Sequence, residues 1–262
     1  MALLSSLTRV SSPFLCLKTL SPLQADLIKS VALAAMLADH VNSILLGGSS
    51  EILYVFGHAA FPIFTLFWAV NLPSESHILR QRARRLWLWA FLTQPLFWLA
   101  FMMQGQSWLA LNILFAYAGC TQLVCWATRW GMNGAMAGMM LLLLMVWPLT
   151  PASYGIPGLV FCLLCLAGRY LSGLGENAIF LMLVLIVMSW LNIPPVINGW
   201  WEDALTYDVL PTLVFPLLII VGISALPAIS GKRMWPRQFF YHAYAAHLML
   251  LGVLAVLPAS YN

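Results

Sequence analysis

Charge is scarce in this chain of 262 residues: only 8% are Asp, Glu, Lys or Arg, against about 25% in an ordinary soluble domain. Apolar residues make up 62%. A soluble fold of this length needs a charged exterior around its core, so the composition excludes an ordinary globular domain. Lipid as solvent removes that requirement. The twelve Trp and eight Tyr also suit a membrane protein, because their amphipathic rings favour the headgroup level. The chain is therefore predicted to be an all-α polytopic integral membrane protein.

Sequence motifs of soluble enzymes are also missing. The chain has no P-loop, no dinucleotide glycine fingerprint, no H-E-x-x-H and no G-x-S-x-G. It lacks the inverted internal repeat of many transporters, and no small-residue cleavage site follows its first apolar stretch. These absences count against pumps, proteases and a cleaved signal peptide.

The five cysteines predict neither a metal site nor a disulfide framework. Cys162 and Cys165 form a C-x-x-C spacing, but within an apolar run that holds no second pair and no His. We expect them to be small buried side chains. The net charge of +4 does not predict a nucleic-acid partner, because the basic residues lie in short clusters between apolar runs.

About nine apolar runs are expected to form transmembrane helices: 27–46, 52–72, 86–103, 109–127, 134–149, 156–171, 178–195, 207–225 and 239–257. Most reach the ~17–25 residues needed to cross ~30 Å of hydrocarbon. The fifth and sixth are short and could instead form a re-entrant pair. Ser21-Pro22-Leu23-Gln24 predicts the start of the first helix, with Ser21 as cap and Gln24 returning a bond to it. Residues 1–21 are thus a short cytoplasmic or interfacial tail, and 22–262 a single helical membrane domain.

Basic residues predict the orientation of these helices. All twelve lie in the N-terminal tail, at the start of the first helix, or in alternate connections: Arg9, Lys18, Lys29, Arg80, Arg82, Arg84, Arg85, Arg129, Arg169, Lys232, Arg233 and Arg237. The opposite connections (47–51, 104–108, 150–155 and 196–206) hold none. The positive-inside rule then places the N-terminus in the cytoplasm and the C-terminus in the periplasm of a multi-pass inner-membrane protein.

Two helices are expected to place imidazoles at one depth. Asp39 and His40 follow Lys29 by ten and eleven residues, and His247 follows Arg237 by ten. At 1.5 Å per residue, all three lie about 15–16 Å from the cytoplasmic interface. Ionisable residues at such depth are candidates for function, although a lone His can also serve to join neighbouring helices. The equal depths permit a shared site, but they do not show that the two helices are adjacent.

Other polar residues lie in the outer half of the predicted membrane. His58 falls within the second run, and Asn112 and Tyr154 lie near outer helix ends. Each can be explained either by a site or by helix capping and packing.

The Arg80, Arg82, Arg84 and Arg85 cluster also permits two interpretations. It can set topology and attract anionic membrane lipid. It can also form a cradle for a polyanionic cofactor, because guanidinium groups match phosphates.

Several blocks of this sequence resemble one known family. The blocks are Ile28-Lys29-Ser30-Val31-Ala32-Leu33 through Met36, Asp39, His40 and Val41; Gly57-His58-Ala59-Ala60-Phe61-Pro62-Ile63-Phe64; Arg85-Leu86-Trp87; Asn112-Ile113-Leu114-Phe115-Ala116; Ser153-Tyr154-Gly155-Ile156; and Trp235-Pro236 with His247-Leu248. In order and over roughly 24–257, they resemble the TraX family, whose members acetylate the N-terminus of conjugative pilin. The family usually has Arg where this chain has His58. A His supplies fewer donors and only a conditional charge.

The resemblance implies acetyl transfer from acetyl-CoA to the N-terminal amine of a pilin subunit. Because that amine has a pKa near 8, a base must remove a proton before it attacks. His40 is the expected base, Asp39 would orient it or stabilise its imidazolium, and His247 would polarise the thioester or share the proton. The four arginines above would bind acetyl-CoA. His58, Asn112 and Tyr154 would position the acceptor, and no metal is expected.

Alternatives from other classes stay open at this stage. They are a pilin-maturation enzyme with a different N-terminal reaction such as cyclisation, a glycan O-acetyltransferase, a non-enzymatic pilin assembly factor, and a proton-coupled transporter. The identity of the acceptor discriminates among the enzymes.

Overall fold

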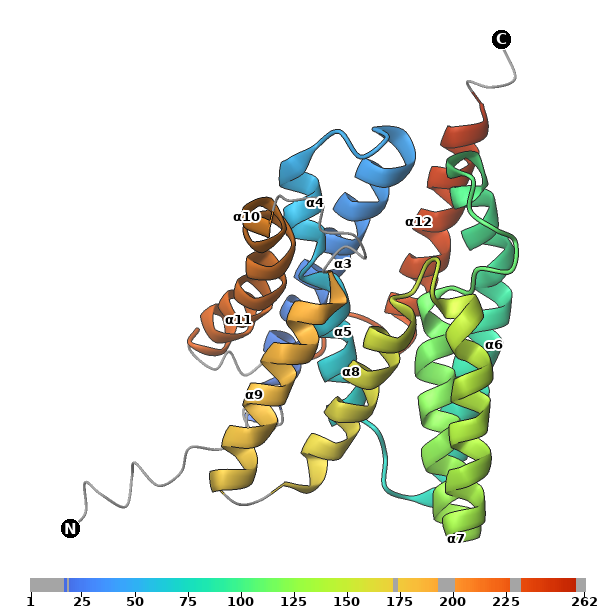
Figure 1. The fold of residues 1–262 in the computed structure, drawn as a ribbon, viewed down its shortest axis with the longest axis vertical. Coiled ribbons are helices and arrows are strands. Elements are labelled where there is room, and N and C mark those ends of the chain that lie inside the picture. The colour runs from blue at the N-terminus through green and yellow to red at the C-terminus, as the bar shows by residue number, and fades with distance from the viewer. Residues whose placement is uncertain (1–16, 18, 172–173, 193–200, 227–231, 258–262) are drawn as a thin grey trace, which may run out of the picture.

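The computed structural model describes residues 17, 19–171, 174–192, 201–226 and 232–257, and this part of the chain is helical throughout, without strands (Figure 1). The helices are α3 (Pro22–Leu45), α4 (Glu51–Gly57), α5 (Ala60–Val70), α6 (Ser76–Phe101), α7 (Ile113–Leu149), α8 (Gly155–Ala167), α9 (Leu174–Leu191), α10 (Trp201–Asp203), α11 (Leu210–Ser224) and α12 (Phe239–Val256). Two short 3₁₀ turns, η1 (Met102–Gln104) and η2 (Gly168–Tyr170), follow α6 and α8, and a π-helical segment, η3 (Ala204–Val209), leads into α11.

The predicted start of the first helix is confirmed. Ser21 caps α3 by accepting from the Gln24 backbone N–H at 3.2 Å, and the Gln24 side chain accepts from the Ser21 N–H at 2.9 Å. The Gln24 amide also donates to the Leu226 carbonyl at 3.1 Å, just beyond the end of α11. This one side chain therefore satisfies backbone groups at two helix ends and joins them.

Six helical segments of the described residues are long and apolar enough to cross a membrane: Pro22–Leu45, Glu51–Val70, Ser76–Gln104, Ile113–Leu149, Ala204–Ser224 and Phe239–Val256. Gly155–Tyr170 and Gly175–Leu191 are shorter apolar helices. The protein is thus a multi-pass helical membrane protein. Each of the nine predicted runs overlaps a helix. The number of helices that cross the membrane and the sides on which the termini lie stay predictions.

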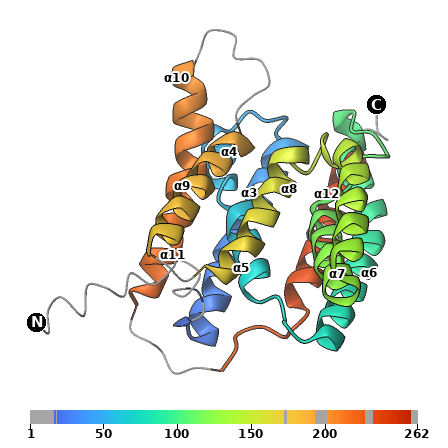
Figure 2. The same ribbon diagram turned by 60° about the horizontal axis from the view of Figure 1, so that its bottom comes forward.

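The long helix α7 is a helical hairpin that contains the fourth and fifth predicted runs. Gly131 has φ 59° and ψ −132°, which breaks the helical path, and the two legs lie side by side (Figures 1 and 2). A Cβ added at Gly138 would lie 2.7 Å from the Cα of Leu123, so glycine permits the legs to approach closely.

Small residues also bring together the helices that carry the candidate site. Helix α12 packs against α6 and α3, and α3 packs against α4 and α5. Ala32 and Ala35 of α3 are fully buried. At Gly252 of α12 an added Cβ would come within 2.9 Å of Leu99 in α6. Close packing of this kind, rather than hydrophobic exclusion from water, holds helices together in lipid.

Candidate active site

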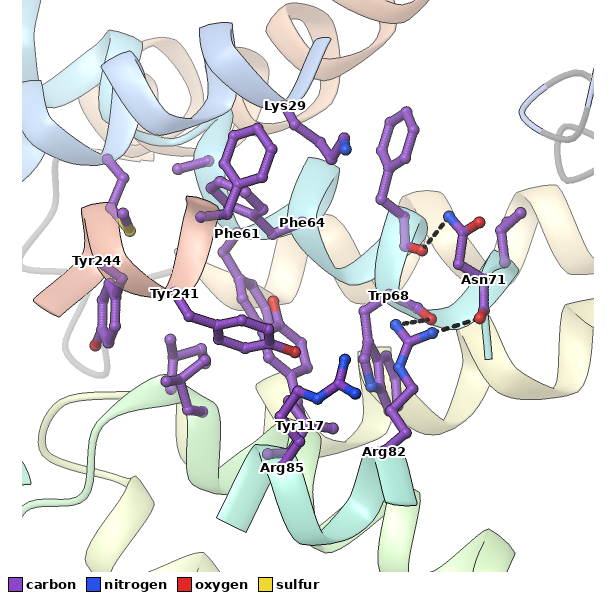
Figure 3. Close-up of a pocket in the computed structure, with 18 of the residues that line it drawn as sticks. Lys29, Phe61, Phe64, Trp68, Asn71, Arg82, Arg85, Tyr117, Tyr241 and Tyr244 are labelled. Carbon is purple, nitrogen blue, oxygen red and sulfur yellow. Dashed lines mark hydrogen bonds between the residues drawn. The ribbon is translucent and has the colours of Figure 1, made fainter. Parts of the chain in front are cut away.

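A cavity of about 1140 Å³ lies among α3, α5, α6 and α12 and reaches the loop before α8. Its size is that of a pocket for a large organic ligand. Basic side chains line part of it, aromatic side chains line much of the rest, and polar groups of α3 and of the 150–154 loop complete it. Figure 3 shows Arg82 and Arg85 of α6, Lys29 of α3 and Tyr241 of α12 projecting into this common space.

The imidazoles of the first and last long helices meet beside this cavity. His40 Nδ1 lies 2.8 Å from His247 Nε2, and the rings are nearly parallel, with centroids 5.0 Å apart and an interplanar angle of 21°. The Phe101 ring packs edge-on against His40 with a centroid distance of 5.2 Å. The structure therefore brings together two residues separated by 207 positions in the sequence.

Hydrogen bonding assigns the tautomers of this pair in its neutral form. The second ring nitrogen of His247, Nδ1, lies 2.9 Å from the Ala243 carbonyl, which can only accept. His247 therefore carries its proton on Nδ1, and its Nε2 accepts the proton of His40 Nδ1. Nε2 of His40 is left with a free lone pair. Because His40 lines the cavity, this nitrogen is the candidate base of the site.

Asp39 also lines the cavity, directly beside the backbone of Gly57. A Cβ added at Gly57 would lie 2.6 Å from the Asp39 Cβ and 3.0 Å from its Oδ1. Glycine at the end of α4 therefore makes room for this side chain. The Nδ1 position of His40, where an orienting carboxylate would bind, is occupied by His247 instead.

Tyr154 lines the cavity beyond Asp39 and has unusual backbone geometry. Its φ of 64° lies in the left-handed region, which is rare for a residue with a side chain. Its ring stacks on Phe61 of α5 at 4.6 Å and 19°. This packing holds the residue at the cavity wall, and its role in positioning the acceptor stays a prediction.

The predicted arginine cradle is divided by the structure. Arg82 and Arg85 line the cavity, whereas exposed Arg80 and exposed Arg84 do not; Arg84 lines a second recess, which it shares with Arg85. The Arg82 guanidinium donates to the Asn71 carbonyl and, at 3.5 Å, to the Trp68 carbonyl, which caps the end of α5. The cofactor-binding assignment of Arg80 and Arg84 is therefore not supported by their placement.

Three further basic residues line the cavity but were not predicted as site residues: Lys29, Arg233 and Arg237. The segment that carries the two arginines is held to α3, because Asp26 accepts from the backbone N–H groups of Met234 and Trp235 at 3.0 and 3.3 Å. The sequence did contain a signal, since these residues share the side of the membrane predicted for the arginine cluster. That signal was used for topology alone.

His58 lies outside the cavity. It is buried, its Nδ1 donates to the Tyr54 carbonyl at 2.7 Å, and its Nε2 lies 3.9 Å from the Asp208 carboxylate. The Tyr54 hydroxyl donates to the same carboxylate at 2.6 Å. These contacts join α4 to η3 and give His58 a packing role, and its placement outside the cavity does not support the predicted role in positioning the acceptor.

Asn112 is likewise a structural residue. It is fully buried and caps α7 by accepting from the Leu114 N–H at 3.0 Å. Its amide donates to the Ala90 carbonyl and to the Gln94 side chain, both at 2.9 Å. The predicted role in positioning the acceptor is not supported, because Asn112 does not line the cavity and both amide hydrogens are used within the bundle.

These features define a multi-pass helical membrane protein with a cavity that is lined by basic side chains and adjoins a histidine pair. The family model described as TraX protein matches residues 24–255. The chain belongs to the TraX family. It is 37% identical over 238 residues to Protein TraX of Escherichia coli, and 38% identical over 241 residues to Protein TraX of Escherichia coli strain K12. Each alignment covers 90% of this chain and 89% of the relative. No solved structure matches.

Proposed function

We propose that this protein is a membrane acetyltransferase that transfers the acetyl group of acetyl-CoA to the N-terminal amine of a conjugative pilin subunit. The observation that carries the proposal is one cavity that contains both the cation cluster and His40, whose free Nε2 follows from its bond to His247. A polyanionic acyl donor and a base that activates an amine need these two features in one space.

The distance between the two features suits a long donor molecule. Lys29 and His40 are eleven residues apart on α3, which corresponds to about 16 Å along the helix. Phosphates bound near Lys29 and Arg85 would leave the flexible arm of the coenzyme to run between the aromatic side chains toward His40. Arg233 and Arg237 add positive charge to the same wall.

The proposed reaction uses His40 twice. Its Nε2 takes a proton from the ammonium group of the acceptor, and the resulting amine attacks the thioester carbon. As the new C–N bond forms, the carbonyl π electrons move to oxygen. The imidazolium of His40 then protonates the sulfur while the C–S bond breaks, and Nε2 takes the second proton from nitrogen. One proton thus reaches the free thiol of the coenzyme, and one is released to solvent in each turnover.

The predicted topology is consistent with this arrangement. The basic residues are assigned to the cytoplasmic side by the positive-inside rule, and acetyl-CoA is a cytoplasmic metabolite. The 150–154 connection, which holds no basic residue, is assigned to the opposite side, and Thr150, Pro151 and Tyr154 line the same cavity. Donor and acceptor could then approach from opposite faces.

The intact mass of pilin from cells with and without the protein tests the proposal. With the wild-type protein we expect pilin to be heavier by one acetyl group, located at its N-terminus by fragmentation. His40→Ala should abolish this modification while the protein remains inserted at wild-type amount, and the exposed His77→Ala serves as the matched control. Unmodified pilin in wild-type cells, or full acetylation with His40→Ala, would contradict the proposal.

A further inference from the structure

The cavity is lined by two carboxyl groups that differ in their surroundings. Asp26 is fully engaged: it pairs with Lys29 at 2.6 Å and accepts from two backbone N–H groups of the 232–238 segment. Asp39, thirteen residues further along α3, makes no hydrogen bond or ion pair with any residue that the structure describes. The two residues are on the same helix, but only one has its protein partners.

None of the basic residues that line the cavity is paired with Asp39 in the described part of the chain. Lys29 is about 15 Å away along α3 and is paired with Asp26. Arg82 is bound to the end of α5. A carboxylate in a membrane-embedded site is costly unless a cation or several donors satisfy it. A cationic group of a ligand in the cavity would supply the partner that the described residues do not.

We propose that Asp39 binds the cationic ammonium group of the acceptor and thereby restricts the enzyme to amine acceptors. This inference rests on the proposed function and adds the residue that recognises its amine acceptor. An ammonium group has a positive charge and three N–H donors, which complement a carboxylate. A sugar hydroxyl offers one donor and no charge, so Asp39 discriminates against glycan acceptors.

The position of Asp39 fits this role. It immediately precedes His40, and both side chains line the cavity. The absence of a side chain at Gly57 leaves the space that the carboxyl occupies. An ammonium nitrogen held by Asp39 is thus placed beside the nitrogen that would accept its proton. Asp39 then binds the acceptor, while His247, and not Asp39, orients His40.

Binding in the absence of acetyl-CoA tests this recognition separately from catalysis. The probes are a synthetic peptide with the N-terminal sequence of a mature conjugative pilin and the same peptide with its N-terminus already acetylated. The full-length protein in lipid nanodiscs should bind the free-amine peptide at least ~10-fold more tightly, a difference typical of one charge-assisted contact. Asp39→Asn should bind both peptides equally, because the amide keeps the shape and loses the charge. Exposed Glu75→Gln is the matched control and should discriminate as the wild type does.

A steady-state assay on the same preparations separates this inference from the proposed function. With acetyl-CoA and the free-amine peptide, Asp39→Asn should raise the KM for peptide at least ~10-fold and leave the KM for acetyl-CoA within about twofold. If Asp39→Asn still prefers the free-amine peptide to the acetylated peptide as strongly as the wild type does, the role of Asp39 is overturned, even if acetylation is observed. If the wild type prefers the free-amine peptide but does not acetylate it, ammonium recognition is sustained and the proposed acetyltransferase activity is overturned. Equal binding of both peptides by the wild type would overturn this inference whatever the activity.

Discussion

Substitution of one glycine should show how tightly the position of Asp39 and His40 is set. In Gly57→Ala the new methyl group would lie 2.6 Å from the Asp39 Cβ, whereas unstrained carbon atoms lie about 3.5–4.0 Å apart. Relief of this overlap requires a displacement of about 1 Å. Both contacting groups are attached to helices, so the shift moves backbone or turns the Asp39 side chain out of position. A displacement of about 1 Å at a reacting group lowers kcat/KM by about 10²-fold.

The same overlap should affect stability only moderately. Overpacking by one methyl group costs about 1–3 kcal/mol. We therefore expect Gly57→Ala to insert and to lose most of its activity, measured as release of free coenzyme A thiol with a pilin peptide as acceptor. The control is Gly222→Ala on α11, where an added Cβ meets no atom within 4 Å. Its activity should stay within about twofold of wild type, and its helix should gain up to about 1 kcal/mol. A folded Gly57→Ala protein with wild-type kcat/KM would refute the argument that glycine is needed to place Asp39.

Two further comparisons test the histidine pair and the cation cluster. His247→Ala leaves the buried Nδ1–H of His40 without its acceptor, a loss of about 1–3 kcal/mol, so kcat should fall by about 10–100-fold. His247→Gln, whose amide oxygen can accept that proton, should retain clearly more activity; equal losses in the two variants would instead indicate that His247 transfers protons. Arg85→Gln should raise the KM for acetyl-CoA by about tenfold, as expected for loss of one contact to a charged group. Arg84→Gln, whose side chain does not line the cavity, should leave this KM unchanged, and similar effects in both variants would show that the cavity is not the donor site.

The helices were predictable because lipid offers no hydrogen-bond partners to the backbone. Every spanning segment must satisfy its own backbone hydrogen bonds, so an apolar run of sufficient length forms a helix. The breaks within runs were not predicted. The 52–72 run is divided at His58 and Ala59, and α5 begins at Ala60 so that Pro62, which lacks an N–H, falls in its first turn. Before α11 the Leu210 N–H donates to the Leu205 carbonyl, an i to i−5 bond that forms a π-helical turn one residue before Pro211.

The depth of a site can be read from a sequence more readily than its partners. Counting residues from the basic interface placed His40 and His247 at one level, and the structure shows that they also face each other. The rotation of each helix about its axis depends on packing at residues such as Ala35 and Gly252, which a single sequence does not reveal. For the same reason, His58 and Asn112 seemed equivalent to Tyr154, although only Tyr154 lines the cavity.

The polar residues of the bundle fall into two kinds: those whose side chains are hydrogen-bonded within the protein and those whose side chains are not. Asn112 donates twice and accepts once within the bundle, and Gln24 joins two helix ends; burial of such groups is offset by their bonds, and their loss should lower stability. Among the residues described, Asp39 and Nε2 of His40 have no protein partner, yet both belong to the cavity wall. In a membrane protein an unmatched polar group at depth is retained only when something other than stability requires it. Asp39 and His40 lie together on the wall of a cavity that basic side chains also line, which is the arrangement that a two-substrate transfer reaction needs.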